Sequence, residues 1–241
     1  MSDQTPCTTV PSQITRSGAA QLKQSSTYDL WMRLPMVIWS TALALMSAAA
    51  LEQYVRTADP ALPGVVYSVN IAMRLFVIAY LVILAAAVIT RRPPIGKARG
   101  AAPRISALIG TFLITAVVLF PRRELPLPLA VVSMFLMLAG DGFAIVVLMQ
   151  LRRSFSIMPE ARELVTSGLY RFVRHPLYLA EEIVAIGSVM QFLSVWTAML
   201  LVVQIAFQIQ RMSNEETVLT EIFPEYASYK RKTERIILGF Y

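Results

Sequence analysis

The chain has 241 residues, of which 56% are hydrophobic and 15% are charged, and its net charge is +7 at pH 7. Soluble globular domains contain about 45–50% apolar and about 25% charged residues, so this composition excludes an ordinary soluble domain and indicates an integral membrane protein. The basic residues cluster beside apolar runs, which favours contact with anionic lipid head groups over binding to nucleic acid. One cysteine, Cys7, and one histidine exclude an internal disulfide and a Cys/His metal site, so we expect no metal.

The first segment, residues 1–33, is rich in Ser, Thr and Gln and predicts a disordered cytoplasmic tail. It contains no apolar stretch of the kind that a cleavable signal peptide carries. The first apolar run begins near Leu34.

Six apolar runs follow, and each approaches the ~20 residues that a helix needs to cross a bilayer. The first four make up a transmembrane region, residues 34–151, with predicted spans at 34–51, 65–90, 105–120 and 127–151. The last two, at 177–193 and 194–210, lack a polar loop between them and predict a helical hairpin within a second region, residues 152–241. After residue 213 a charged, amphipathic tail should lie at the membrane interface. The sequence therefore predicts an all-α, polytopic membrane bundle of about six transmembrane helices.

Lysine and arginine concentrate in three stretches, residues 91–104, 152–174 and 230–235. With six spans, all three lie on the same side as the amino terminus, and the positive-inside rule predicts that this side is cytoplasmic. Arg122 and Arg123 fall on the opposite side, where Glu124 partly offsets them. We therefore expect a multi-pass protein with both termini in the cytoplasm.

Ionisable residues also occur within the predicted spans. Arg74 and Asp141 lie near the middle of the second and fourth spans, where charged groups usually pair or face a cavity. We expect an Arg74–Asp141 ion pair, with a role at a lipid-substrate cavity as the alternative. Glu181 and Glu182 begin the fifth span, and either a site or solvation at the interface explains them.

The single histidine lies in a polar segment directly before the fifth span. Residues 166–168 (Thr-Ser-Gly) predict a turn, and His175 precedes Pro176, which suits the first position of a helix. The amide groups at such a helix start favour an anionic or polar ligand. Tyr170 and Tyr178 flank His175 and predict either the walls of a pocket for a flat ring or interfacial belt residues.

A second polar cluster, Arg211 with Glu215 and Glu216, follows one helical hairpin later. Arg211 and Glu215 share a helix face, which is typical of a helix-end ion pair and also of a site that binds both a carboxylate or phosphate and a cationic group. Because a hairpin returns to its starting side, both clusters should meet at the same membrane face and form one composite site.

These residues resemble the isoprenylcysteine carboxyl methyltransferase family, within the wider group that includes the phospholipid N-methyltransferases. The resemblance rests on residues 151–156 (LRRSFS), 164–170 (LVTSGLY), 174–178 (RHPLY), Arg211 with Glu215-Glu216, and 223–229 (FPEYASY). It implies a membrane enzyme that binds S-adenosylmethionine in a cytoplasm-facing pocket and meets a lipid or prenylated small-molecule acceptor from the bilayer. The region 152–241 would then be the catalytic part. Ala180 and Pro224 depart from the family pattern, where many members have glycine.

The resemblance also assigns roles to particular residues. Arg211 would be the catalytic, substrate-facing arginine, and Glu216 would join it in binding the substrate. The implied cofactor-binding residues are Arg162, Glu163, Leu164, Val165, Tyr170, His175, Pro176, Leu177, Tyr178 and Glu215.

The acceptor and the reaction class leave alternatives. A carboxylate acceptor of the isoprenylcysteine type needs no general base, whereas an amine acceptor, as in phospholipid N-methylation, would use Glu182 or Glu216 as the base. A sterol-reductase-like membrane reductase would bind the phosphates of NADPH through Arg152, Arg153 and Arg162. A non-enzymatic membrane subunit or transporter would leave both polar clusters without a role.

Overall fold

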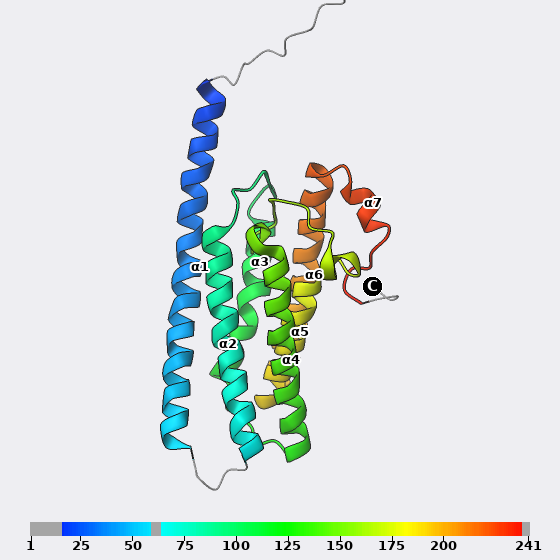
Figure 1. Cartoon of the computed structure of the whole chain (residues 1–241). Coiled ribbons are helices and arrows are strands. Elements are labelled where there is room, and N and C mark those ends of the chain that lie inside the picture. Colours follow the sequence, from blue (N-terminus) through cyan, green and yellow to red (C-terminus); the bar gives the residue numbers. More distant parts are fainter. Residues whose placement is uncertain (1–15, 59–63, 238–241) are drawn as a thin grey trace, which may run out of the picture.

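The computed structural model describes residues 16–58 and 64–237 and shows a bundle of helices with very little sheet (Figure 1). Its helices are α1 (Arg16–Thr57), α2 (Gly64–Thr90), α3 (Ala102–Phe112), α4 (Leu127–Leu151), α5 (Pro176–Gln191), α6 (Val195–Ile222) and α7 (Tyr226–Lys230). The 3-10 helices η1 (Leu113–Leu119), η2 (Arg152–Ser154) and η3 (Gly168–Arg171) and an antiparallel strand pair, β1 (Gly96–Lys97) with β2 (Glu160–Ala161), connect them. The predicted all-α membrane bundle is confirmed.

Five helical segments within the described residues are long and apolar enough to cross a membrane: Asp29–Thr57, Gly64–Thr90, Ala102–Leu119, Leu127–Ser154 and Val195–Ile222. The remaining predicted span is α5, which has 16 residues. At about 1.5 Å of rise per residue α5 covers about 24 Å, less than the ~30 Å hydrocarbon core. It is the shorter arm of the predicted hairpin, which turns at Ser194, where the side chain caps α6 by accepting a hydrogen bond from the Thr197 amide.

The predicted disordered tail, residues 1–33, differs from the structure in its second half, because α1 begins at Arg16. Residues 1–15, which include Cys7, lie outside the described residues. Alanine, leucine, glutamine and lysine occur early in α1, and all four favour helix. Asp29 then anchors α1 to its neighbours, since its buried carboxylate pairs with Arg33 at 2.6 Å and with Arg91 at 2.9 Å.

Helices α4 and α5 pack most closely, and glycine makes this approach feasible. A Cβ atom on Gly140 would lie 2.6 Å from Val184 Cγ2, and one on Gly187 would lie 2.9 Å from the Ser133 carbonyl oxygen. Ser133 Oγ donates a hydrogen bond to the Gly187 carbonyl at 2.7 Å, which links the two helices inside the apolar bundle. Small residues at helix contacts are typical of membrane proteins, because they let two backbones approach.

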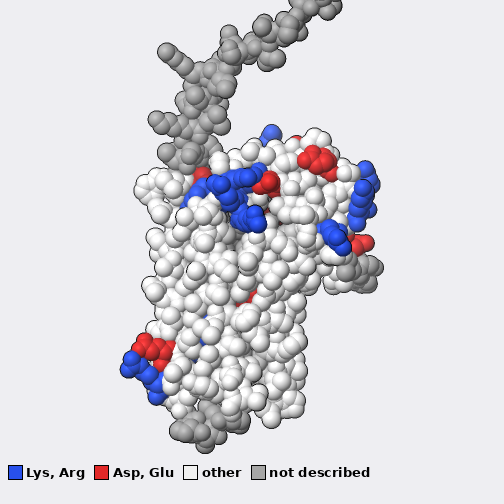
Figure 2. All heavy atoms as spheres, in the orientation of Figure 1, with Lys and Arg blue, Asp and Glu red and all other residues white. Residues whose placement is uncertain are grey.

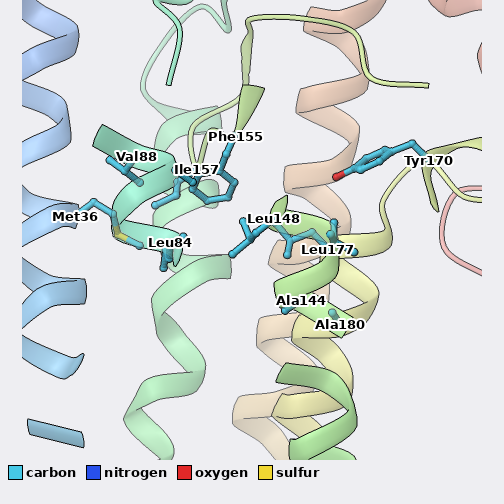
Figure 3. Packing of buried hydrophobic residues seen from close by; sticks show 12 residues of the cluster. Met36, Leu84, Val88, Ala144, Leu148, Phe155, Ile157, Tyr170, Leu177 and Ala180 are labelled. Carbon is cyan, nitrogen blue, oxygen red and sulfur yellow. The ribbon is translucent and has the colours of Figure 1, made fainter. Parts of the chain in front are cut away.

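The main hydrophobic cluster lies where the helices meet the segment that follows α4. Figure 3 shows Met36 of α1 and Leu84 of α2 on one side of it, and Leu148 and Leu177 on the other. Phe155, Ile157 and Tyr170 of the connecting segment join this cluster from above the helix ends. Their burial holds the polar segment 152–175 against the bundle, over the start of α5.

Most of the charged side chains lie at the end of the bundle that carries β1, β2 and α7, while the surface along the middle of the helices is almost uncharged (Figure 2). The expected ion pair between Arg74 and Asp141 is wrong. The Arg74 guanidinium lies over the ring of Tyr54, 4.9 Å from its centroid, and Asp141 is buried in the wall of a cavity that Arg74 does not line. Hydropathy places a residue along a helix axis, but it does not determine the direction in which the side chain points.

Candidate active site

The segment between α4 and α5 folds back over the bundle because a strand pairing and a glycine turn direct it. Strand β2 pairs with β1 in the register Gly96↔Ala161, so residues 160–161 lie beside the loop that follows α2. The predicted turn at residues 166–168 is confirmed, because Gly168 has a φ angle of +63°. This turn is fixed by Gln150, whose Oε1 accepts a hydrogen bond from the Leu169 amide at 2.9 Å.

Helix α5 starts at Pro176, as predicted, with His175 as its N-cap residue. No side chain caps this helix start; Pro176 has no N–H and the Leu179 amide donates to the His175 carbonyl, so the amides of Leu177 and Tyr178 are available to a ligand. The backbone before it is held by the carboxyl-terminal segment, since the amides of Arg174 and His175 donate to the carbonyls of Glu234 and Arg235 at 2.8 and 3.0 Å. The open helix end is therefore rigidly placed.

Glu216 of α6 is the centre of an ion cluster behind this helix start. Its carboxylate lies 3.0 Å from Arg174 Nε, 3.2 Å from His175 Nε2, 2.8 Å from Lys230 Nζ and 3.1 Å from Arg235 Nε. The Glu216 side chain is only 3% exposed. This cluster joins α5, α6 and the segment after α7, and it directs the imidazole of His175 toward α6.

Glu215 points the other way, because neighbouring residues on a helix lie about 100° apart. It accepts a hydrogen bond from Tyr178 Oη at 2.7 Å. The guanidinium of Arg211, one turn earlier on α6, lies over the ring of Tyr178, 4.7 Å from its centroid. Arg211 pairs with Glu181 (Nη1 to Oε2, 3.8 Å) instead of with Glu215, so the expected ion pair within α6 is replaced by one between helices.

A cavity opens between the start of α5, the middle of α6 and the connecting segment. Nine of the ten residues that the family resemblance assigns to the cofactor line it, together with Arg211. The nine are Arg162, Glu163, Leu164, Val165, Tyr170, His175, Leu177, Tyr178 and Glu215. Pro176 is fully buried beneath the helix start, and Glu216 faces the ion cluster; neither lines the cavity.

Arg162 lines the cavity and also forms ion pairs that hold the structure together. Its side chain is 0% exposed and pairs with Glu160 at 2.6 Å and with Asp29 at 3.1 Å, and it also donates to the Arg92 carbonyl. Arg162 thus ties the cavity-lining segment to α1. Asp29 could not be predicted as its partner, because the two residues are far apart in the chain and belong to different predicted regions.

The cavity is also lined by two tyrosines of α7, Tyr226 and Tyr229, which were not predicted as site residues. Their spacing of three residues places them on one helix face, which was the available signal. Tyr229 Oη donates to the Tyr170 carbonyl at 2.5 Å and so fastens α7 to η3. Burial raises the pKa of Tyr170 well above its usual value and that of Tyr229 to about 12, so both hydroxyls stay protonated at neutral pH.

Residues 131–221 match the family model of the isoprenylcysteine carboxyl methyltransferase (ICMT) family. The match covers less than half of the chain, so this segment is similar to the ICMT family. This similarity supports a membrane methyltransferase. The ICMT segment extends from within α4 to the end of α6 and contains the connecting segment, the helix start at His175 and the α6 cluster. No curated protein matches the chain.

Proposed function

We propose that this protein transfers a methyl group from S-adenosylmethionine to a lipophilic acceptor that reaches the site from the bilayer. The observation that carries the proposal is the cavity in which an uncapped helix start, a carboxylate and several tyrosine rings converge. The ICMT family in general uses S-adenosylmethionine, which is an amino acid zwitterion joined through a positive sulfonium to adenosine.

The chemistry of the lining residues suits such a cofactor, and the cavity, about 70 Å³ in this structure, has to widen to admit it. The free amides at the start of α5 suit its carboxylate, and Glu215 suits one of its positive groups. Tyr170, Tyr226 and Tyr229 offer ring faces for the adenine. The cavity also contains a buried polar atom that has no partner among the described residues, Tyr226 Oη. A polar ligand would satisfy this group, which is costly to leave unpaired.

When bound, the cofactor supplies an activated methyl group, so the protein has to provide position and exclusion of water. Tyr178 holds the Glu215 carboxylate in place through its hydroxyl group, and its ring supports the Arg211 guanidinium from below. Because Arg211 is 2% exposed and reaches both the cofactor cavity and Glu181, it is the residue best placed to meet the acceptor.

The family description names a carboxyl acceptor, for which Arg211 would be the cationic partner. Arg211 already donates to the Ile157 carbonyl (3.2 Å) and to Gln208 Oε1 (3.4 Å), and it pairs with Glu181. These partners satisfy much of the hydrogen-bonding capacity of Arg211. The proposed function therefore does not restrict the acceptor to a carboxylate.

The positive-inside rule supports a cytoplasmic position for this site and for both termini. The polar end of the bundle carries the arginines and lysines of the loop after α2, of the connecting segment and of the tail, and the cavity opens at this end (Figure 2). Cytoplasmic S-adenosylmethionine would then reach the cavity directly.

A reductase that uses NADPH is less well supported. Arg152 and Arg153 lie outside the cavity wall, and Arg153 Nε donates to the Thr90 carbonyl at 2.9 Å. The third candidate, Arg162, already pairs with Asp29 and Glu160 through Nη2. The cavity thus offers few free cations to a dinucleotide phosphate.

Transfer of a radiolabelled methyl group from S-adenosylmethionine into a membrane lipid extract tests the proposal. We expect the full chain to label a lipid, Glu215→Gln to lose most of this activity, and Glu221→Gln, which changes an exposed carboxylate of the same helix, to retain it. A folded protein that labels no lipid or prenyl thiol, or that binds NADPH and not S-adenosylmethionine, would contradict the proposal.

A further inference from the structure

A second cavity lies deeper in the bundle, between helices α1, α2, α4, α5 and α6 and the α3–η1 segment. Its volume is about 530 Å³, within the ~300–1,000 Å³ of small-molecule sites. Most of its wall is apolar, with side chains such as Trp39, Leu84 and Val184. The charged groups in its wall are Asp141 and Glu181, and the described lining contains no lysine or arginine.

Asp141 has no hydrogen bond or ion pair within the described part of the chain, although its residue is only 6% exposed. Its helix approaches α5 closely at the preceding residue, Gly140, where a Cβ atom would lie 3.1 Å from the Ala180 carbonyl oxygen. This contact brings Asp141 into the same wall as Glu181. A lone carboxylate among apolar helices is costly and usually faces a partner or a ligand.

Gln204 of α6 adds an independent observation. It is 1% exposed; its Nε2 donates to the Gly110 carbonyl at 3.4 Å, while its Oε1 accepts from no group of the described residues. Other polar groups of the wall do not supply a cation: Thr111 and Thr115 donate to carbonyls of their own turns. The hydroxyls of Tyr80 and Ser188 complete the polar lining. The cavity therefore presents the Asp141 carboxylate and the Gln204 amide oxygen, which lack donors among the described residues, while Glu181 accepts from Gln208 Nε2 at 2.8 Å and pairs with Arg211.

The deep cavity adjoins the cofactor cavity through one ion pair. Glu181 belongs to its wall, and Arg211, 3.8 Å away, belongs to the wall of the cofactor cavity. On the other side, Met36, Trp39 and Thr115 are shared with a third, mainly apolar cavity of about 590 Å³ between α1 and α3. A polar head at Asp141 and Glu181 would thus lie beside the cofactor site, with room for a hydrocarbon tail toward the bilayer.

We propose that the deep cavity binds the methyl acceptor and that the acceptor's head group is a primary or secondary amine on a lipid tail. This inference rests on the proposed function in calling the ligand the acceptor. An ammonium group donates two or three hydrogen bonds and neutralises a buried carboxylate, whereas a carboxylate head would add a further negative charge beside Asp141 and Glu181. A lipid alcohol could donate one hydrogen bond but would leave the charge of Asp141 uncompensated, whereas Glu181 already pairs with Arg211.

Binding of three amphiphiles with the same chain tests the head group: oleylamine, oleyl alcohol and oleate. The full chain is placed in phosphatidylcholine nanodiscs without S-adenosylmethionine, and binding is followed by the fluorescence of Trp39 and the other tryptophans. We expect oleylamine to bind about tenfold or more tightly than oleyl alcohol, and oleate to bind most weakly. In Asp141→Asn this preference should fall about tenfold, while Glu124→Gln, an exposed carboxylate near the opposite end, should leave it unchanged.

If Asp141→Asn does not fold, Gln204→Met provides a second test. This variant should weaken the binding of oleylamine several-fold and have little effect on the binding of oleate. Equal binding of amine and alcohol, tighter binding of oleate, or an amine preference that survives both variants would overturn the inference. Because the cofactor is absent from these samples, amine binding can succeed or fail independently of S-adenosylmethionine binding, which is measured separately on the same protein.

Discussion

Glu216 provides the sharpest test of how the site is held together. Its side chain is 3% exposed, and four cationic or titratable groups lie within 3.2 Å of it. Glu216→Gln keeps the shape and removes the charge, so Arg174 and Arg235, whose side chains are 11% and 16% exposed, lose their common counterion. The start of α5 and the segment after α7 should loosen together.

The size of the expected loss of stability in Glu216→Gln follows from how deeply the cationic partners of Glu216 are buried. Removing one member of a buried ion pair costs about 3–5 kcal/mol, but Lys230 is half exposed and water can solvate it in the variant. We therefore expect a loss of about 2–4 kcal/mol. In a chain of this size, about 2–4 °C per kcal/mol then predicts a fall of about 5–15 °C in the melting temperature.

Thermal unfolding of the detergent-purified protein measures this fall, with Glu221→Gln as the matched control because that carboxylate is exposed on the same helix. Cofactor affinity should drop in parallel, since the cluster positions His175 and Tyr226 beside the cavity. A melting temperature for Glu216→Gln that equals the control would refute the view that this cluster organises the site.

Three further predictions concern the frame of the cavity. Gly168→Ala should lower the melting temperature by several degrees, because φ is +63° and the new Cβ atom would lie 2.6 Å from Gln150 Oε1. Gly64→Ala is the control and should leave the melting temperature unchanged, because its new Cβ atom would have no atom within 4 Å. Asp29→Asn should destabilise the protein by about 2–4 kcal/mol in denaturation assays, since it removes the carboxylate partner of buried Arg91 and leaves Arg162 with Glu160 alone; an unchanged midpoint would contradict this. Tyr178→Phe removes the 2.7 Å hydrogen bond to Glu215, so stability should fall by about 1 kcal/mol and titration should show weaker cofactor binding.

The sequence predicted those features that depend on local chemistry. A glycine after Thr-Ser indicated the turn at Gly168, and the dipeptide His175-Pro176 indicated where α5 begins; both are confirmed. The absence of a polar loop before Ser194 indicated the hairpin that returns Arg211 to the level of His175. Hydropathy, turns, helix ends and helix periodicity all depend on a few neighbouring residues, so a single sequence reveals them.

Features that depend on the rotation of helices could not be read in the same way. Glu215 and Glu216 are adjacent in sequence, yet one faces the cavity and the other faces a cationic cluster, because a step of one residue turns the helix by about 100°. The same uncertainty led to the wrong pairing of Arg74 with Asp141. Asp29 was missed because two of its partners, Arg91 and Arg162, come from distant segments that only the packed structure brings together.

The central claim is that the cavity at the start of α5 binds S-adenosylmethionine. Calorimetric titration of S-adenosylmethionine into the detergent-purified chain tests it most directly, with Glu215→Gln beside the wild type and Glu221→Gln as control. We predict saturable binding by the wild type and the control, and binding weakened about tenfold or more in Glu215→Gln. No binding by a well-folded wild type, or equal affinity in all three proteins, would contradict the account.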